Sequence, residues 1–293
     1  MPAPILVVGE VLWDSLPSGL FLGGASHNVA CHLHQLGVDA VLASRVGGDA
    51  LGREAVRRVA ARGLSADLLQ TDPALPTGFV HVEMEAGGIP AYDIMRPAAW
   101  DAIAATEALV EAASSARALV FGTLAQREET SRQTLRALWK VASLHVCDIN
   151  LRPPYVSREV VEASLRTADL AKLNDDEVET LAGWYGLGDD LGSATQRLAE
   201  QFEIATVCVT RGPRGALLLR EGVLYEHPGY PAAVADTVGA GDAFLAALLA
   251  ALLDDVSAAD ALDRANRLGA FVAGALGAIP PYDPAAVFAP TPA

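Results

Sequence analysis

Short apolar runs alternate along the chain with longer segments rich in Ala, Arg and Glu. The apolar runs are rich in Val, Ile and Leu and predict strands at residues 5–8, 40–44, 118–121, 144–149, 170–173, 206–210 and 215–219. The other segments predict helices at residues 26–36, 51–62, 101–113, 130–141, 157–167, 175–182, 193–201, 242–253 and 258–276. Most of the strands are apolar throughout, which is typical of strands covered on both faces. The pattern predicts a three-layer, doubly wound α/β fold with a mostly parallel sheet.

Two stretches interrupt this alternation and predict a small β-sheet lid. Residues 11–24 follow the first strand, and residues 77–98 contain two extended arms around Gly87 and Gly88. Polar and apolar residues alternate between Phe79 and Met84, as on a sheet with one solvent-exposed face. We expect one domain, residues 1–293, with a lid formed by about residues 11–24 and 77–98. Ordinary surface hairpins are the alternative interpretation of these two stretches.

Charge and cysteine content exclude several classes of protein. The 293 residues carry a formal net charge of −15, which argues against nucleic acid as a partner. The longest apolar block, residues 243–253, is shorter than the roughly 20 residues that a membrane-spanning helix needs. The three cysteines are far apart and odd in number, so they predict neither a disulfide framework nor a paired metal site. We therefore expect a cytoplasmic protein.

The segment DTVGAGDAF at residues 236–244 carries the strongest chemical signal. Gly239 and Gly241 allow the backbone to approach a ligand closely, and the free N–H groups of the following helix predict an anion site. Asp242 is either a plain N-cap or a general base beside that anion. The helix behind it is apolar on all sides and must be buried, which favours the base. A carboxylate beside a phosphate site is what phosphoryl transfer to an alcohol requires.

Lysine is scarce, and this limits how phosphate could be bound. Lys140 and Lys172 are the only lysines, and neither follows a glycine as in a P-loop. No protein-kinase pattern and no GxGxxG motif after the first strand are present. A bound nucleoside triphosphate would therefore rely on backbone N–H groups, arginine and a metal ion. Arg152 is the candidate arginine, because it follows Asp148 and Asn150 at the end of a predicted buried strand.

Two segments resemble the signatures of the ribokinase-like carbohydrate kinases, the B-type phosphofructokinase group. Residues 236–242 resemble the second signature, and GGASHNVA at residues 23–30, with RVGGDALG at residues 45–52, resembles the first. The two lie in the right order and spacing, and the match spans nearly the whole chain. The resemblance implies a ribokinase-like fold and an ATP-dependent sugar kinase that uses Mg²⁺.

The resemblance also implies roles for individual residues on the sugar side. Asp242 would take the proton from the sugar hydroxyl, and an anion hole for the transferring phosphoryl group would be formed by Gly239, Ala240 and Gly241. The sugar hydroxyls would be bound by Asp14, Gly24 and Asn28.

On the nucleotide side, Asn174 and Glu177 match an Asn-x-x-Glu motif that handles Mg²⁺ and phosphate through water. Other residues match the nucleotide site by their positions in a turn and a late helix: Thr210, Gly212, Gly215 and Asn266. A monovalent cation, K⁺, is implied next to the anion hole, where Asp236, Val238 and Gly277 lie.

Several segments resemble bacterial fructokinases in particular: GEVLWD at residues 9–14, PAYDI at residues 90–94, GTLAQR at residues 122–127 and DINLR at residues 148–152. Fructose is therefore the expected substrate, with Tyr92, Arg96 and Asn150 as further sugar-binding residues under a closing lid. Ala25 and Ser26 replace the Lys-Gly pair of ribokinases, which weakens ribose as substrate.

Three alternatives stay open at this point. Arg96 could bind a carboxylate, as in the related 2-keto-3-deoxygluconate kinases, or it could be a solvated charge. Another sugar or a nucleoside could be the substrate. A catalytically silent relative could bind sugar or a protein partner. The family also leads us to expect a homodimer that forms through the lid.

Overall fold

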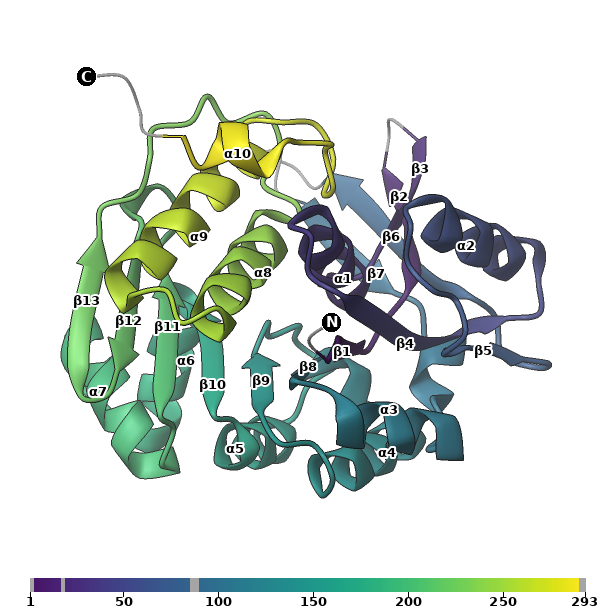
Figure 1. Ribbon diagram of the computed structural model, residues 1–293. Helices are drawn as coiled ribbons and strands as arrows, with labels where there is room; N and C mark the ends of the chain where they lie inside the picture. The colour runs from purple at the N-terminus through teal and green to yellow at the C-terminus, as the bar shows by residue number, and fades with distance from the viewer. Residues whose placement is uncertain (1–2, 17–18, 85–89, 290–293) are drawn as a thin grey trace.

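The computed structural model describes residues 3–16, 19–84 and 90–289 and contains a nine-stranded sheet at its centre (Figure 1). Its strand order is β13-β12-β11-β10-β9-β8-β1-β4-β5, and the strands from β11 to β5 in this order pair in parallel. The strands are β1 (Ile5–Val8), β4 (Ala40–Gly47), β5 (Leu69–Asp72), β8 (Ala118–Gly122), β9 (His145–Asp148), β10 (Leu170–Asn174), β11 (Thr206–Thr210), β12 (Ala216–Arg220) and β13 (Val223–His227). The predicted mostly parallel α/β fold is confirmed.

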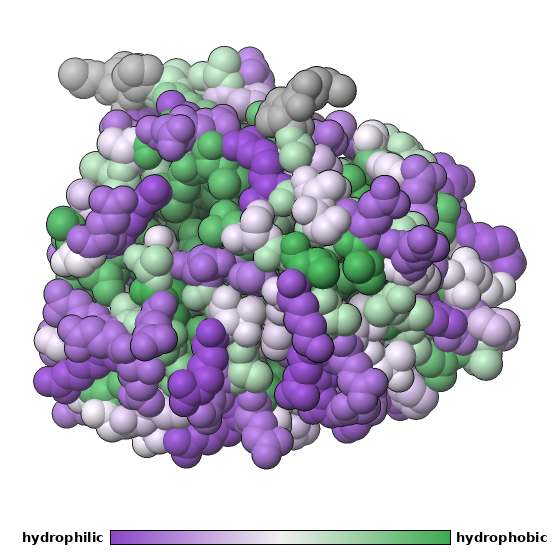
Figure 2. Space-filling model, turned by 60° about the horizontal axis from the view of Figure 1, so that its bottom comes forward, coloured by the Kyte–Doolittle hydropathy of each residue, from purple (hydrophilic) through white to green (hydrophobic). Residues whose placement is uncertain are grey.

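Helices cover both faces of this sheet. One face packs against α1 (Ala25–Gln35), α2 (Ala50–Ala61), α8 (Ala240–Leu253) and α9 (Ala258–Ala273), and the short α10 (Pro284–Val287) follows α9. The other face packs against α3 (Glu107–Ser115), α4 (Glu129–Trp139), α5 (Arg158–Thr167), α6 (Asp175–Tyr185) and α7 (Leu191–Phe202). In Figure 2 the layer with α3, α4 and α5 comes forward, and hydrophilic side chains cover most of the lower surface. None of the helices in the described ranges has the length and apolar character needed to span a membrane.

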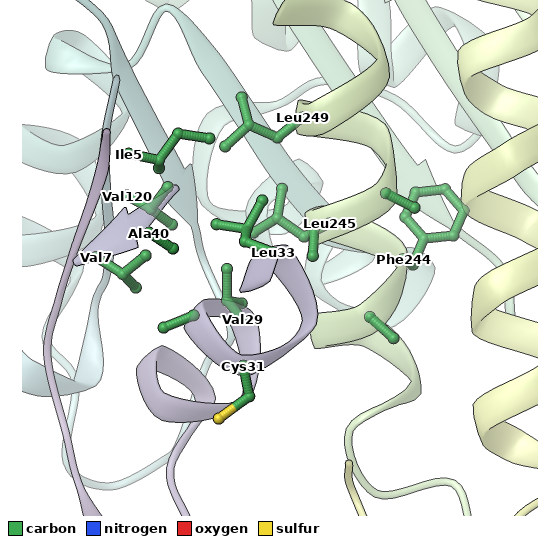
Figure 3. Close-up of a cluster of buried hydrophobic side chains, with 14 of the residues drawn as sticks. Ile5, Val7, Val29, Cys31, Leu33, Ala40, Val120, Phe244, Leu245 and Leu249 are labelled. Carbon is green, nitrogen blue, oxygen red and sulfur yellow. The ribbon is translucent and has the colours of Figure 1, made fainter. Parts of the chain in front are cut away.

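The first of the two hydrophobic cores fixes α1 against α8. Leu33 and Val29 of α1 lie close to Leu245 of α8, beside the buried strand residues of the sheet (Figure 3). Burial of such large aliphatic side chains contributes about 1.5–3 kcal/mol each, so the two helices are held firmly together. The chemistry described below depends on this packing.

A second, smaller sheet stands beside the main one and is called the small sheet here (Figure 1). Its order is β3-β2-β6-β7, formed by β2 (Leu12–Leu16), β3 (Gly19–Gly23), β6 (Gly78–Met84) and β7 (Pro90–Ile94). The two stretches that interrupted the α/β alternation therefore pair with each other, through parallel contact of β2 with β6. The predicted turn at Gly87 and Gly88 lies outside the described residues.

The structure corrects several predicted boundaries. A helix over residues 101–113 is wrong at its start: residues Ala99–Ala102 form a 3₁₀ turn, and α3 begins at Glu107 because the Thr106 hydroxyl caps it by accepting from Leu109 N. The edge strands β5 and β13 have no counterpart in the prediction. Polar residues make up most of β5, and β13 contains no buried residue, so neither forms a continuous apolar run.

Candidate active site

Two cavities meet where α8 begins. The first has a volume of about 380 Å³ and lies between the small sheet and the carboxyl ends of the main strands. The second has a volume of about 560 Å³ and lies between the turn after β11, the segment before α8, and α9. Both include Asn174, Thr210, Thr237 and Gly241 in their walls. Ligands of open α/β sheets bind at this edge, and the geometry suits two molecules that meet at the start of one helix.

Asp242 lies at this meeting point, and the alternative that it is a helix N-cap is wrong. The N-cap of α8 is Gly239, and Asp242 is the third residue of the helix. Its Oδ2 accepts a hydrogen bond from Asn28 Nδ2 at 2.8 Å. Burial and the nearby Asp148 carboxylate raise the pKa of Asp242 to about 6, against the lowering effect of Asn28. The carboxylate is therefore ionised at neutral pH, and a pKa near the working pH suits a general base.

The backbone at the start of α8 provides hydrogen-bond donors. Gly239 is in the left-handed region with φ 79°, and a Cβ there would lie 2.4 Å from the carbonyl oxygen of Ala278. Ala240 N donates to Thr237 O at 3.3 Å. Within the described residues, the N–H groups of Gly241 and Asp242 have no acceptor. Among the residues expected to form the anion hole, Ala240 therefore has its N–H group already engaged. The free donors are the N–H groups of Gly241, which was expected, and of Asp242, which was not.

Lys172 is the cavity residue that sequence reasoning missed. Its ammonium group on β10 donates to both Asp148 carboxylate oxygens at 2.9 Å, and both side chains are less than a tenth exposed. A Cβ on Gly241 would lie 3.4 Å from Lys172 Nζ. Burial lowers the pKa of Lys172, but Asp148 and Glu177 outweigh that effect and raise it, so the group stays cationic.

A lysine therefore lies in this cavity, although the sequence led us to expect that phosphate charge would be met by backbone N–H groups, arginine and a metal ion. Lys172 lines the first cavity beside the free donors of α8. A signal was available in the sequence, because Lys172 interrupts an otherwise apolar buried strand and charged residues are seldom buried without a specific partner.

Most of the residues expected to bind sugar surround the first cavity. It is lined by Asp14, Gly24, Asn28, Asn150, Arg152 and Asp242. Burial and the Asp242 charge raise the pKa of Asp14 to about 6. Asn150 adopts a left-handed conformation with φ 41°, which Asn tolerates better than most residues. The Asn28 Oδ1 is buried and has no hydrogen-bond partner within the described part of the chain.

Arg96 does not line this cavity. It follows β7, where the chain leaves the small sheet, and its exposed guanidinium pairs with the Glu128 carboxylate instead. The small sheet contributes Val80 and Ile94 to the cavity wall. The side chain of Tyr92, also expected there, lies outside the described part of the structure.

The residues expected on the nucleotide side divide into two groups. Thr210, Gly212, Gly215 and Asn266 line the second cavity. Glu177 is not among the residues that line either cavity. One of its carboxylate oxygens accepts from Leu151 N at 2.7 Å and the other from Asn174 N at 2.9 Å. Because Asn174 Oδ1 accepts from Glu177 N in return, the pair forms a capping box for α6. Asn174 therefore lines both cavities, and its hydrogen bonds with Glu177 hold it in place.

The three residues expected at a monovalent cation are brought together. The two oxygens of Asp236 accept from Val238 N at 3.0 Å and from Gly277 N at 3.3 Å. In the described ranges, no group of three or more His, Cys, Asp or Glu side chains could hold a metal ion.

Comparisons with known proteins agree with this geometry. Residues 19–285 match the model of the pfkB family carbohydrate kinases. A fructokinase of Klebsiella pneumoniae is 31% identical over 300 residues, which span 95% of this chain and 96% of that relative. A fructokinase double mutant from Vibrio cholerae O395, solved with fructose, ADP and potassium, is 25% identical with a TM-score of 0.80 and 94% coverage of both chains. A sugar kinase from Pyrococcus horikoshii in complex with ATP is 26% identical, with a TM-score of 0.76 and the same coverage.

Proposed function

The chain belongs to the pfkB family of carbohydrate kinases, and we propose that within this family it is an ATP-dependent fructokinase. As a family member it is a sugar kinase, a phosphotransferase that acts on a sugar hydroxyl. The observation that carries the proposal is the meeting of the two cavities at Asp242 and the free N–H groups of α8. Fructose is supported by relatives named as fructokinases and by the neighbour solved with fructose and ADP.

In this mechanism the sugar occupies the first cavity and ATP the second, with its γ-phosphoryl group at the start of α8. Asp242 accepts the proton of the attacking hydroxyl while Asn28 holds the carboxylate in place. The N–H groups of Gly241 and Asp242, together with the Lys172 ammonium, offset the charge on the transferring group. Arg152 is exposed at the cavity rim and supplies further positive charge.

The donor set fits a Mg²⁺ ion that arrives with the nucleotide. Mg²⁺ keeps several waters and is usually bound through one or two carboxylates plus substrate phosphates, not by an all-protein cage. Asn174 would meet such a hydrated ion, with Glu177 supporting it. When bound, the ion neutralises phosphate charge.

A K⁺ ion is proposed next to the anion site, at Asp236, Val238 and Gly277. Support comes from the convergence of these residues and from the Vibrio cholerae fructokinase solved with potassium. The Asp236 carboxylate holds both segments together through their backbone N–H groups.

Arg96 bears on the choice between a neutral sugar and a sugar acid. Its pairing with Glu128, outside the cavity lining, supports a substrate without a carboxylate. The cavity instead carries Asp14, Asn28 and Asn150, whose oxygens and amides suit hydroxyl groups. Neutral fructose is therefore favoured over 2-keto-3-deoxygluconate.

We further propose that the protein is one kinase domain that dimerises through the small sheet, which acts as a lid. Leu20 and Phe21 on edge strand β3 are 38% and 42% exposed, and apolar edge strands need a partner to cover them. Size-exclusion chromatography of wild type and of Phe21→Asp tests the dimer, because the Phe21→Asp substitution should dissociate it.

The three cysteines are free and buried, which suits a reducing cytoplasm.

The decisive experiment measures ADP release with ATP and Mg²⁺ over a panel of fructose, glucose, ribose, 2-keto-3-deoxygluconate and a nucleoside. We expect the highest kcat/KM with fructose, and loss of turnover in Asp242→Asn with ADP binding retained. Turnover with 2-keto-3-deoxygluconate alone would replace fructose as substrate. Sugar binding without ADP release for any compound would indicate a silent relative.

A further inference from the structure

Glu10 is a buried carboxyl group that the mechanism above does not use. It follows β1, is only 4% exposed, and lines the first cavity. Its Oε1 accepts a hydrogen bond from Ala25 N at 3.1 Å, and its Oε2 has no partner among the described residues. Burial, against the effect of its own backbone hydrogen bond, raises the pKa of Glu10 to about 7. A buried carboxyl group is unfavourable, so its contacts should explain why it is there.

The start of α1 explains the contact with Ala25. The N-cap of this helix is Gly24, which has no side chain to bond the free N–H groups of the first turn. Gly24 has φ 102°, and a Cβ there would lie 2.4 Å from Glu10 O. The close passage of the two chain segments therefore excludes a capping side chain at the N-cap position. Glu10, in the loop between β1 and β2, supplies the missing acceptor instead.

The first turn of α1 controls the side chain that holds the base. Asn28 N donates to Gly24 O at 2.9 Å, which is the first hydrogen bond of the helix. The amide of the same residue donates to Asp242 Oδ2. An unanchored first turn would fray and carry the Asn28 side chain away from Asp242, because helix ends without caps lose their terminal hydrogen bonds.

We propose that Glu10 is a positioning residue for phosphoryl transfer, whose carboxyl group anchors the first turn of α1 and thereby holds Asn28 against Asp242. Glu10 acts through the helix and contacts no reacting atom. The inference rests on the proposed role of Asp242 as base, but not on fructose as substrate. It can therefore be tested with any sugar that the wild-type enzyme phosphorylates.

Two substitutions separate anchoring from mere packing. Glu10→Met has similar length but no acceptor for Ala25 N, so kcat should fall about 2- to 30-fold, the range for loss of a helix cap. Glu10→Gln keeps an acceptor oxygen and should recover most of kcat. Its amide nitrogen would face an inner cavity of about 20 Å³ beneath Glu10, which has room for one water molecule. The KM for ATP should stay within about twofold in both variants, because the second cavity is built from other elements.

Asp190→Ala is the matched control. Asp190 caps α7 by accepting from Ser193 N at 2.8 Å, and α7 carries no residue of the site. This variant should lose a comparable amount of thermal stability and keep wild-type kcat. ADP binding titrations give the folded fraction of each variant, so that kcat is compared per folded molecule.

A double-mutant cycle supplies the decisive readout. If Glu10 acts through Asn28, Glu10→Met should have no further effect on kcat in an Asn28→Ala background. If the fold-losses in kcat of the two single variants multiply in the double variant, the proposal is overturned. Wild-type kcat in Glu10→Met would also overturn it. Asp242→Asn in the same assay distinguishes the role of Asp242 as base from the role of Glu10 in positioning. Full activity of Asp242→Asn would reject the base itself, whereas an inactive Asp242→Asn beside a fully active Glu10→Met would reject only the positioning role.

Discussion

The side-chain amide of Asn28 donates a 2.8 Å hydrogen bond to Asp242 across a separation of 214 residues. The two residues come from α1 and α8, which share one hydrophobic core (Figure 3). Because the cores of proteins are closely packed, the donor and the carboxylate are held in position before any ligand binds. The geometry of this pair is thus a consequence of helix packing.

Asn28→Ala is expected to lower kcat about 10- to 100-fold, the usual effect of losing a hydrogen bond to a charged group. The Asn28 hydrogen bond lowers the pKa of Asp242, so its loss should also move the acidic limb of the pH–rate profile upward. Steady-state kinetics between pH 5 and 9 measure both effects. Wild-type kcat in Asn28→Ala would show that the contact has no part in catalysis.

The rate should depend on pH through Asp242. The pKa of its carboxyl is raised to about 6, and a general base works only when ionised. We therefore expect kcat/KM to be level above about pH 7 and to fall by up to about tenfold per pH unit below pH 6. Asp14 and Glu10 also have raised pKa values in this cavity, so the observed midpoint belongs to the coupled group. A profile that is flat from pH 5 to 8 would contradict Asp242 as base.

Lys172→Met should reduce kcat about a hundredfold or more, as the loss of one oxyanion-stabilising donor does in other enzymes. It should also destabilise the fold by about 3–5 kcal/mol, since the Asp148 carboxylate would stay buried without its partner. The double variant Lys172→Met with Asp148→Asn removes that charge and should regain stability without regaining activity. Lys140→Met, an exposed position and the only other lysine, is the control. Equal kinetics for the two single variants would refute a role for Lys172.

Two alanine substitutions at the start of α8 should behave differently. Gly239→Ala meets a left-handed φ and the Ala278 carbonyl oxygen, so it should lower the free energy of unfolding by more than about 1 kcal/mol. Gly241→Ala makes only ordinary contact with Lys172 Nζ and should stay as stable as wild type. Its methyl group would nevertheless lie next to the Lys172 ammonium at the start of α8, and kcat should fall. Thermal unfolding and kinetics on both variants check this, and full activity of Gly241→Ala would place the phosphoryl group elsewhere.

Much of the fold could be predicted from local pattern. Strands such as β1 and β11 are buried on both faces and therefore read as continuous apolar runs. The sequences of edge strands β5 and β13 do not predict strands, because they lack an apolar run. Backbone pairing with the neighbouring strand stabilises them only once the sheet has formed. Contact between β2 and β6 joins two stretches that the sequence separates by two helices and two strands, α1, β4, α2 and β5. Their pairing depends on the tertiary fold.

The sequence by itself determined the α/β class, the glycine turn before α8 and the carboxylate at Asp242, because these depend on residues that are neighbours in the chain. The roles it predicts for Asp14, Asn174 and Asn266 stay predictions. Only the tertiary structure decided that Lys172 lines the first cavity near Gly241, that Arg96 pairs with Glu128, and that Glu10 accepts from Ala25 N at the start of α1. Each of these outcomes depends on which charged group lies within hydrogen-bonding reach after folding. Over such short distances in a buried site, partner choice is set by the packing of distant segments and not by the pattern along the chain.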